Sequence, residues 1–345
     1  MTFPTSLPEA RTLDPKDAPS LRWGILATGW IAERFTSSLL QHTGQRVVAV
    51  GSRHHAKAAA FASQWGIATA YGSYEELVAD PDVDIIYVAT PHSEHHANAL
   101  LAIAAGKHVL VEKAFTRNAV EAHEVIDAAT AAGVFVQEAM WTRYLPRTDV
   151  VRQLLADGVL GELSSVIADH GQFMEPNPEG RMYNPALAGG ALLDLGVYPV
   201  SYAAFALGTP SAIAAVGRRT GTGVDGQVSA VLQASSGAQA LVDTTLYART
   251  PTTASLSGSA ARIELSGDFY SPGPVVLVSR DGERREWDAN PIPGHEGLCY
   301  QGVDAARRIS EGALESALLP LSETLSIMET MDEIRRQVGV VYPGE

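Results

Sequence analysis

Cysteine is almost absent from this sequence. Among 345 residues only Cys299 carries a thiol, so no disulfide can form within the chain. This excludes the class of small disulfide-stapled proteins, and a single thiol suits a reducing compartment. We therefore expect a cytoplasmic protein.

Positive charge is also scarce. The chain has 25 Lys and Arg against 39 Asp and Glu, a formal net charge of −14. Nucleic-acid binding depends on clustered basic side chains, so we expect no nucleic-acid partner. The acidic balance mainly predicts solubility.

Long apolar runs are missing as well. No run of about 18 apolar residues suggests a membrane span, so we expect no membrane partner. The first twenty residues contain Pro4, Pro8, Pro15 and Pro19 and no apolar core, unlike a signal peptide. Residues 1–20 are therefore an N-terminal tail, either disordered or an arm over a cofactor or a partner subunit.

The first half of the chain alternates strands and helices. Residues 21–146 have the pattern of an α/β Rossmann domain, a doubly wound parallel sheet. The expected strands are 23–26, 46–50, 85–89, 109–111 and 134–137. The expected helices are 31–41, 56–64, 74–79, 95–105 and 119–132.

The second half has a different sequence pattern, in which longer β-rich segments are separated by Gly and Ser. We predict that residues 147–345 form an α+β domain for substrate binding and oligomerisation. It would have an open, mostly antiparallel sheet, helices on one face and a C-terminal helix. The expected strands are 164–170, 212–219, 227–234, 238–247, 254–257, 261–265 and 275–279.

A possible dinucleotide fingerprint follows the first expected strand. Ala27-x-Gly29-x-x-Ala32 matches G-x-G-x-x-G/A with the first glycine replaced. Gly29 would let the backbone approach a pyrophosphate, and Ala32 would let the helix pack on the strand. An ordinary Gly/Ala-rich turn has the same sequence, but its place before a helix favours cofactor binding. The expected contacts are Ala27, Thr28, Gly29, Trp30 and Ile31.

The end of the second strand carries no acidic residue for a ribose 2′-hydroxyl. Ser52 and Arg53 stand there instead, with Lys57 one turn later. A hydroxyl and fixed cations suit a 2′-phosphate, so we predict NADP rather than NAD. The alternative is an arginine that is merely exposed on a loop.

Polar residues also follow the next two strands. Thr90, His92 and His95 come after the third, and Glu112-Lys113 ends the fourth. The histidines are either metal ligands or polar caps lining a pocket; because no carboxylate or cysteine cluster completes a metal set, we expect no metal. A lysine at this edge can donate to a substrate hydroxyl and stabilise an anion.

These motifs together resemble the glucose-fructose oxidoreductase / inositol dehydrogenase family of NAD(P)-dependent enzymes. The family usually reads Glu-Lys-Pro where this chain has Glu112, Lys113 and Ala114. The stretch 137–146 resembles the branch of dimeric dihydrodiol dehydrogenases and NADP-dependent xylose dehydrogenases. The resemblance rests on the fingerprint, 52–53, 90–91, 105–109, 112–113, 137–146, 297–300 and 327–343.

The resemblance implies further site residues. Trp141 and Arg143 join Thr90, His92, His95, Glu112 and Lys113 as expected cofactor contacts, and Arg143 and Lys113 also as substrate contacts. Phe173 and Tyr183, with Gln172, Glu175 and Arg181, are candidate substrate contacts in the loop 170–184.

The segment 189–199 contains Asp194 and Tyr198, which share a face if it is helical. Pro199 would strain the helix after that point. The local sequence also fits a capping aspartate and a buried tyrosine. The family pattern is Asp-x-Gly-x-His, and in the branch resembled here a tyrosine replaces the histidine as acid/base.

The chemistry needs a base for the hydroxyl proton while the nicotinamide takes a hydride. A free tyrosine has a pKa near ~10, and lowering it by about two units takes roughly 2.7 kcal/mol. A close ammonium such as that of Lys113 favours the phenolate. We assign Lys113, Tyr198 and Asp194 as the catalytic group, with Asp194 orienting substrate hydroxyls.

The expected function is an NADP-dependent oxidoreductase acting on a CH–OH group of a sugar, cyclic polyol or trans-dihydrodiol. Two alternatives remain: a glucose-fructose-type enzyme with a tightly bound cofactor, and a non-catalytic sugar or NAD(P) sensor. The resemblance also implies a homodimer or a dimer of dimers.

Overall fold

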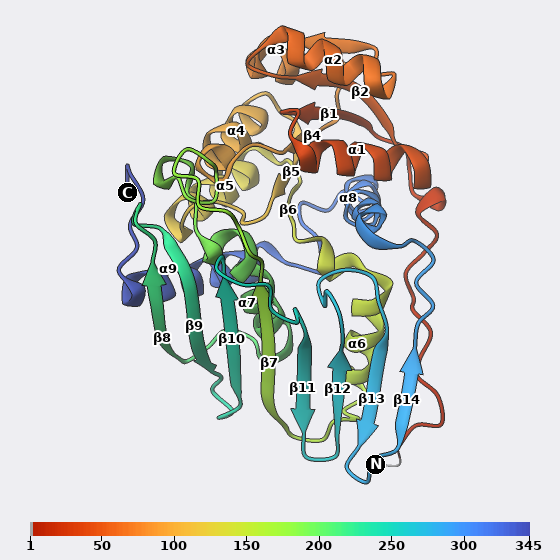
Figure 1. Ribbon diagram of the computed structural model, residues 1–345. Helices are drawn as coiled ribbons and strands as arrows, with labels where there is room; N and C mark the ends of the chain where they lie inside the picture. Colours follow the sequence, from red (N-terminus) through yellow and green to blue (C-terminus); the bar gives the residue numbers. More distant parts are fainter. Residues whose placement is uncertain (1–2) are drawn as a thin grey trace. The chain divides into compact units, whose positions relative to one another are not determined.

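The computed structural model describes residues 3–345, which form two compact units (Figure 1). The nucleotide unit comprises residues 13–144 and 294–325. The sheet unit comprises residues 3–12, 145–293 and 326–345. The sequence suggests a single boundary near Pro146, whereas the chain passes between the units near residues 12, 144, 293 and 325.

The nucleotide unit is built on a six-stranded sheet in the order β3-β2-β1-β4-β5-β6. Every neighbouring pair is parallel, as the alternating pattern predicts. Strands β4, β5 and β6 are almost wholly buried, which explains the apolar runs of β4 and of the middle of β5, whereas β6 carries the buried polar residues Gln137 and Glu138. The strands are β1 (Arg22–Leu26), β2 (Arg46–Gly51), β3 (Thr69–Tyr71), β4 (Ile85–Val88), β5 (His108–Glu112) and β6 (Val136–Ala139).

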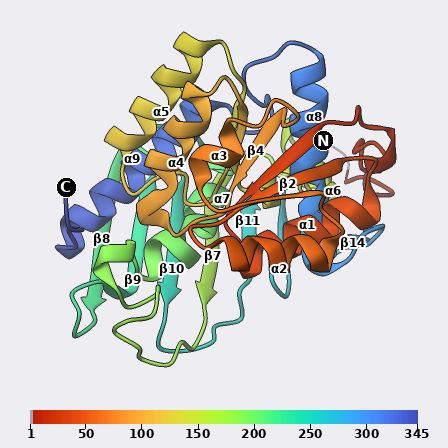
Figure 2. The same ribbon diagram turned by 90° about the horizontal axis from the view of Figure 1, so that it is seen from above.

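Helices pack on this sheet, and α4 lies beside α5 (Figure 2). A late segment of the chain joins the unit: α8 packs on α1, where the Ser38 hydroxyl accepts the Cys299 N–H at 2.7 Å. The helices are α1 (Trp30–His42), α2 (His55–Trp65), α3 (Tyr74–Val78), α4 (His92–Ala104), α5 (Ala119–Ala132) and α8 (Cys299–Ser310). Short 3-10 turns are η1 (Pro15–Asp17), η2 (Trp141–Tyr144) and η5 (Gly294–Leu298).

The sheet unit contains eight strands in the order β14-β13-β12-β11-β7-β10-β9-β8. Only the central pair β7 and β10 is parallel, so the sheet is mostly antiparallel as expected. The strands are β7 (Leu163–Gly171), β8 (Ala212–Arg219), β9 (Asp225–Gln233), β10 (Gln239–Thr245), β11 (Ala254–Gly258), β12 (Ala261–Leu265), β13 (Val275–Ser279) and β14 (Arg284–Trp287).

Helices α6 (Pro146–Ala156) and α7 (Val197–Leu207) lie on one face of this sheet, and α9 (Leu321–Val338) carries the chain toward its C-terminus (Figure 1). On the strands, Ile167, Val216 and Leu241 remain exposed. The unit therefore has one face covered by helices and one face with exposed apolar side chains.

The described part of the N-terminal tail is held by contacts with its own chain. Arg11 pairs with Asp149 of α6 at 2.9 Å, and Gln153 donates to the Glu9 carbonyl at 2.8 Å. Further on, the Asp14 carbonyl accepts from Arg307 of α8. These partners lie more than a hundred residues away in sequence, which is why composition alone did not reveal them.

One helical stretch, 185–207, is long and apolar enough to cross a membrane by length and composition. We expected no such run from the sequence; Asp194 and Pro199 lie among the apolar residues of this stretch. In the structure 78% of its most apolar window is buried inside the protein. A buried core helix passes the same test, and this stretch covers the sheet unit's core.

The turn between β1 and α1 has an unusual backbone. Ala27, at the position of the fingerprint's first glycine, has φ of 85° and donates its N–H to the Gly51 carbonyl at 3.0 Å. A positive φ brings the Cβ of an L-residue too close to the following carbonyl and costs about 1–2 kcal/mol, a cost that glycine avoids.

We expect Ala27→Gly to stabilise the protein by about 0.5–1 kcal/mol, since relief of the backbone strain exceeds the extra entropy of glycine in the unfolded chain. The matched control is Ala128→Gly inside α5, which should lose about 1 kcal/mol. Urea denaturation measures the stability of both variants. An Ala27→Gly protein less stable than the parent would contradict the inference that the backbone at Ala27 is strained.

Candidate functional site

The predicted cofactor contacts lie along one edge of the nucleotide unit. They follow the carboxyl ends of β1, β2, β4, β5 and β6 in turn. Because these strands are parallel neighbours, the ends share one edge of the sheet. In open α/β sheets ligands bind at this edge.

The fingerprint turn leaves room for a ligand. Gly29 caps α1 in an extended conformation, and a Cβ added to it would meet nothing within 4 Å. No side chain caps the first amides of α1, so these N–H groups suit an anion. Trp30, the first residue of the helix, is 55% exposed.

At the end of β2 the residues differ in burial. Ser52 is buried, and its hydroxyl accepts the His54 N–H at 3.4 Å. Arg53 and Lys57 are exposed. Arg53 also lies beside Tyr74, whose pKa is raised chiefly by burial while the guanidinium opposes that rise. A buried hydroxyl beside two exposed cations fits the recognition of a ribose phosphate.

After β4, His95 is buried with both ring nitrogens facing backbone carbonyls. Its Nδ1 lies 2.8 Å from the Ala114 oxygen and its Nε2 lies 2.8 Å from the Thr90 oxygen. Burial lowers the pKa of His95. Within residues 3–345 no three His, Cys, Asp or Glu side chains gather as a metal would require. His95 thus ties the end of β4 to the segment after Lys113.

The end of β5 places Lys113 at the same edge. Glu112 is buried and receives the Tyr87 hydroxyl at 2.5 Å on one oxygen and the Lys113 N–H at 3.2 Å on the other. The Lys113–Ala114 peptide bond is cis. The Lys113 side chain is half-buried, whereas Ala114 is fully buried.

After β6, an aromatic cluster includes a residue that the sequence did not reveal. The His295 ring stacks on Trp141 at 5.7 Å and meets Trp30 edge-on at 5.1 Å. Arg143 is buried and donates to Glu323 at 2.6 Å. His295 lies in the short 3-10 turn η5, in a Pro/Gly-rich part of the sequence, and no sequence spacing links it to either tryptophan.

The sheet unit carries Asp194 and Tyr198 on one helical turn. Asp194 lies in the π-helical turn η4 (Leu192–Gly196), which runs directly into α7. Pro199 was expected to strain the helix, but α7 continues to Leu207. Pro199 has no N–H for the Leu195 carbonyl, and the wider π turn before it accommodates that loss.

The two side chains have defined partners. Both carboxylate oxygens of Asp194 accept from the Arg181 guanidinium, at 2.9 and 3.2 Å. The Tyr198 ring stacks on Tyr270 at 4.6 Å, with the His170 ring 5.4 Å away. Tyr198 is therefore held within an aromatic group.

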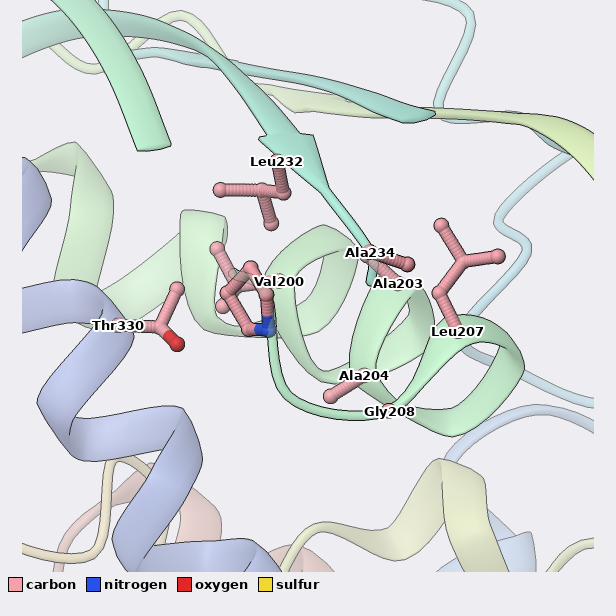
Figure 3. A pocket seen from close by; sticks show the side chains of 9 residues that line it. Val200, Ala203, Ala204, Leu207, Gly208, Leu232, Ala234 and Thr330 are labelled. Carbon is pink, nitrogen blue, oxygen red and sulfur yellow. The ribbon is translucent and has the colours of Figure 1, made fainter. Parts of the chain in front are cut away.

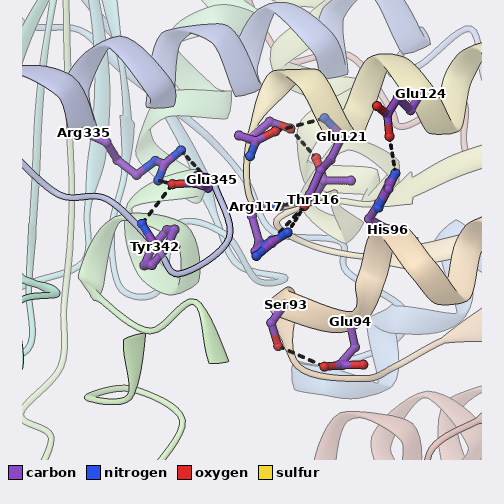
Figure 4. Close-up of polar contacts among 11 residues, drawn as sticks. Ser93, Glu94, His96, Thr116, Arg117, Glu121, Glu124, Arg335, Tyr342 and Glu345 are labelled. Atoms are coloured by element: carbon purple, nitrogen blue, oxygen red, sulfur yellow. Dashed lines mark hydrogen bonds and ion pairs between the residues drawn. The ribbon is translucent and has the colours of Figure 1, made fainter. Parts of the chain in front are cut away.

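The start of this segment is anchored by a buried acid. Asp225 accepts the Leu192 N–H at 2.6 Å, and burial raises the pKa of Asp225 to about 6. The Tyr342 hydroxyl donates to the Gly189 carbonyl at 2.7 Å. Arg335 and the Tyr342 N–H both bond Glu345, which fixes the C-terminal turn (Figure 4).

The loop residues offered as substrate contacts have diverse surroundings. Phe173 and Glu175 are exposed, and Gln172 contacts His170 at 3.0 Å. Tyr183 packs in the core, and its hydroxyl donates to the Met174 carbonyl at 2.8 Å. Substrate contact by these residues stays a prediction.

A small pocket in the sheet unit does not resemble a polyol site. Side chains of α7, among them Val200 and Leu207, line it with Leu232 of β9 and Thr330 of α9 (Figure 3). The lining is almost wholly apolar, whereas a polyhydroxylated ligand needs converging polar groups.

Arg147 on α6 fixes the loop that carries Tyr270. Its guanidinium is buried and meets only backbone oxygens, and burial lowers the pKa of Arg147 to about 10. The accepting carbonyls are those of Ser266, Asp268, Phe269, Ser271 and Pro274. Arg147 therefore helps to hold the loop whose Tyr270 ring stacks on Tyr198.

We expect Arg147→Met to lose about 2–4 kcal/mol, because it leaves several buried carbonyls without donors. The control is Arg152→Met on the same helix, where a partly exposed pair with Asp149 at 3.5 Å should cost under about 1 kcal/mol. Chemical denaturation and near-ultraviolet circular dichroism measure stability and aromatic packing. Equal stability of the two variants would refute the anchoring role.

Comparisons with known proteins agree with this geometry. Residues 21–140 match a family described as an oxidoreductase family with an NAD-binding Rossmann fold, and residues 148–267 match the GFO/IDH/MocA C-terminal domain. A trans-1,2-dihydrobenzene-1,2-diol dehydrogenase from Bos taurus is 37% identical, covering 94% of this chain and 99% of its own.

A D-xylose 1-dehydrogenase (NADP(+)) from Hypocrea jecorina is 39% identical, covering 94% of this chain and 93% of its own. The solved structure of a 3-ketoreductase from Actinomadura kijaniata with NADP and TDP-benzene has a TM-score of 0.82 and 26% identity. It covers 93% of this chain and 98% of its own. The chain belongs to the glucose-fructose oxidoreductase / inositol dehydrogenase (GFO/IDH/MocA) family of oxidoreductases.

Proposed function

We propose that this enzyme is an NADP-dependent oxidoreductase acting on a CH–OH group of a sugar, cyclic polyol or trans-dihydrodiol. The observation that carries the proposal is the shared sheet edge, where the open turn at Gly29, the Ser52-Arg53 pair and Lys113 follow parallel strands of one sheet. Relatives named as a dihydrodiol dehydrogenase and an NADP-dependent xylose dehydrogenase support it. These names also disfavour a non-catalytic sensor.

The residues present fit the dinucleotide. The amides at the start of α1 would hold the pyrophosphate, and Ser52 and Arg53 would hold the 2′-phosphate. The bound nicotinamide supplies hydride acceptance or donation. Tyr198 takes the hydroxyl proton, Lys113 donates to the same oxygen and favours the phenolate, and Asp194 orients neighbouring hydroxyls.

Cofactor choice is tested at the end of β2. Arg53→Ala should weaken NADP binding about 10- to 100-fold, since a charge-assisted hydrogen bond contributes about 1.5–3 kcal/mol, and should leave NAD binding almost unchanged. Arg46→Ala, exposed at the opposite end of the same strand, is the control. Tighter binding of NAD than NADP by the parent, measured by fluorescence titration, would sink the assignment.

The acid/base assignment is tested at Tyr198. Tyr198→Phe keeps the ring that stacks on Tyr270 and loses only the hydroxyl, so cofactor affinity should persist while turnover falls about 10²–10⁴-fold. Tyr202→Phe, one turn further along α7, should stay near the parent. The assay pairs NADP with panels of aldoses, inositols and diols. Near-normal turnover of folded Tyr198→Phe would end the assignment.

We also propose a homodimer or a dimer of dimers formed through the exposed face of the sheet unit. Leu241 and Ile167 are paired neighbours on β10 and β7, and they are 44% and 51% exposed. Adjacent exposed apolar residues on a sheet suit a self-complementary interface with a second copy. A cytoplasmic location, proposed from the single thiol, remains to be tested by fractionation of the source cells.

Light scattering at micromolar concentration should show at least a dimer, and Leu241→Arg should shift the mass toward the monomer. Val120→Lys, at a residue 68% exposed on α5 of the nucleotide unit, is the control and should not change the mass. A monomeric parent protein would rule out this interface.

A further inference from the structure

Glu138 is a buried acid to which the proposed reaction assigns no role. It lies on β6 with 1% of its surface exposed. One carboxylate oxygen accepts the Phe115 N–H at 3.2 Å, and the other accepts the Thr324 hydroxyl at 3.2 Å. Burying a carboxyl group costs free energy unless hydrogen bonds compensate. The groups that Glu138 contacts therefore indicate what the residue does.

The Phe115 N–H belongs to the peptide group whose carbonyl is that of Ala114. The Ala114 oxygen lies 2.8 Å from His95 Nδ1, so the two atoms of one peptide group are held from opposite sides, by His95 and by Glu138. This peptide group follows Lys113 by one residue. The two contacts thus hold the chain directly after Lys113, where it leaves β5.

The charges around Glu138 come from several elements. Burial raises the pKa of Glu138 to about 7, Glu112 on β5 adds to the rise, and the Thr324 hydroxyl, Arg143 of η2 and the Phe115 N–H oppose it. Tyr144 of η2 also lies near, and burial raises the pKa of its hydroxyl well above the usual range. Glu323 in turn pairs with Arg143.

We propose that Glu138 is a positioning residue for Lys113, holding the Ala114–Phe115 peptide group in its working orientation only while it is ionised. The proposal rests on the proposed role of Lys113. A carboxylate accepts the Phe115 N–H more strongly than a neutral carboxyl does. Turnover therefore falls as the pH drops and Glu138 takes up a proton, while cofactor affinity changes little.

The test is the pH profile of kcat between pH 5.5 and 9. Ionisation of Tyr198 and of Glu138 should together give the parent a steep acid limb. Glu138→Gln should leave the shallower, single-proton limb of Tyr198 and turn over about tenfold more slowly at pH 8, with KM for NADP within about twofold. The control is Asp304→Asn in α8, which removes another buried carboxyl of the same unit. The Asp304 carboxylate accepts a hydrogen bond from the Ser316 hydroxyl. Asp304→Asn should keep the parental limb.

Thr324→Val provides a second variant that does not touch the Lys113 segment. It removes one hydrogen bond to the ionised form, so the acid limb should move up by about one pH unit. The proposal is overturned if Glu138→Gln keeps the parental acid limb, or if the acid limb of Thr324→Val lies at the same pH as that of the parent. If Glu138→Gln does not fold, Thr324→Val decides. Parental turnover in Lys113→Met would instead overturn the role of Lys113 itself.

Discussion

The parallel pairing of the six strands in the nucleotide unit is the constraint on which the proposed chemistry depends. Because all six run in the same direction, residues distant in sequence come to one edge wherever a strand ends. The fingerprint turn, Ser52, Thr90 and Lys113 need no contact with one another to be placed together. The sheet brings these residues to one edge, and local contacts then fix each side chain.

Most of these local contacts are hydrogen bonds from buried polar side chains to backbone groups. His95 and Glu138 hold the Ala114–Phe115 peptide group. In the sheet unit Asp225 holds the start of the turn that carries Tyr198, and Arg147 holds the loop of Tyr270. Each of these side chains would be costly to bury without its partners, so each fixes one local conformation.

Much of the fold was predictable from the sequence, because apolar periodicity reports burial directly. The limits expected for 119–132, 212–219, 261–265 and 275–279 are those of α5, β8, β12 and β13. Strands β3 and β14 were missed, since Thr69–Tyr71 is only three residues long and Arg284–Trp287 is a charged edge strand. Neither has an apolar run that a pattern could detect.

The residues of the candidate site could be predicted only where they lie in sequence motifs. Ala27, Ser52, Lys113 and Tyr198 stand in recognisable patterns. Arg147 reaches carbonyls 119–127 residues away, and His295 joins tryptophans from the first half of the chain. Such pairings are set by tertiary packing, and no local spacing encodes them.

The central proposal is that Lys113 and Tyr198 act on the same substrate hydroxyl. A crystal structure of the enzyme with NADP and a bound polyol measures this most directly. We expect Lys113 Nζ and Tyr198 Oη each within ~3.2 Å of one ligand hydroxyl. A productive complex in which the two groups contact different ligand atoms, or in which one of them does not reach the ligand, would contradict the claim.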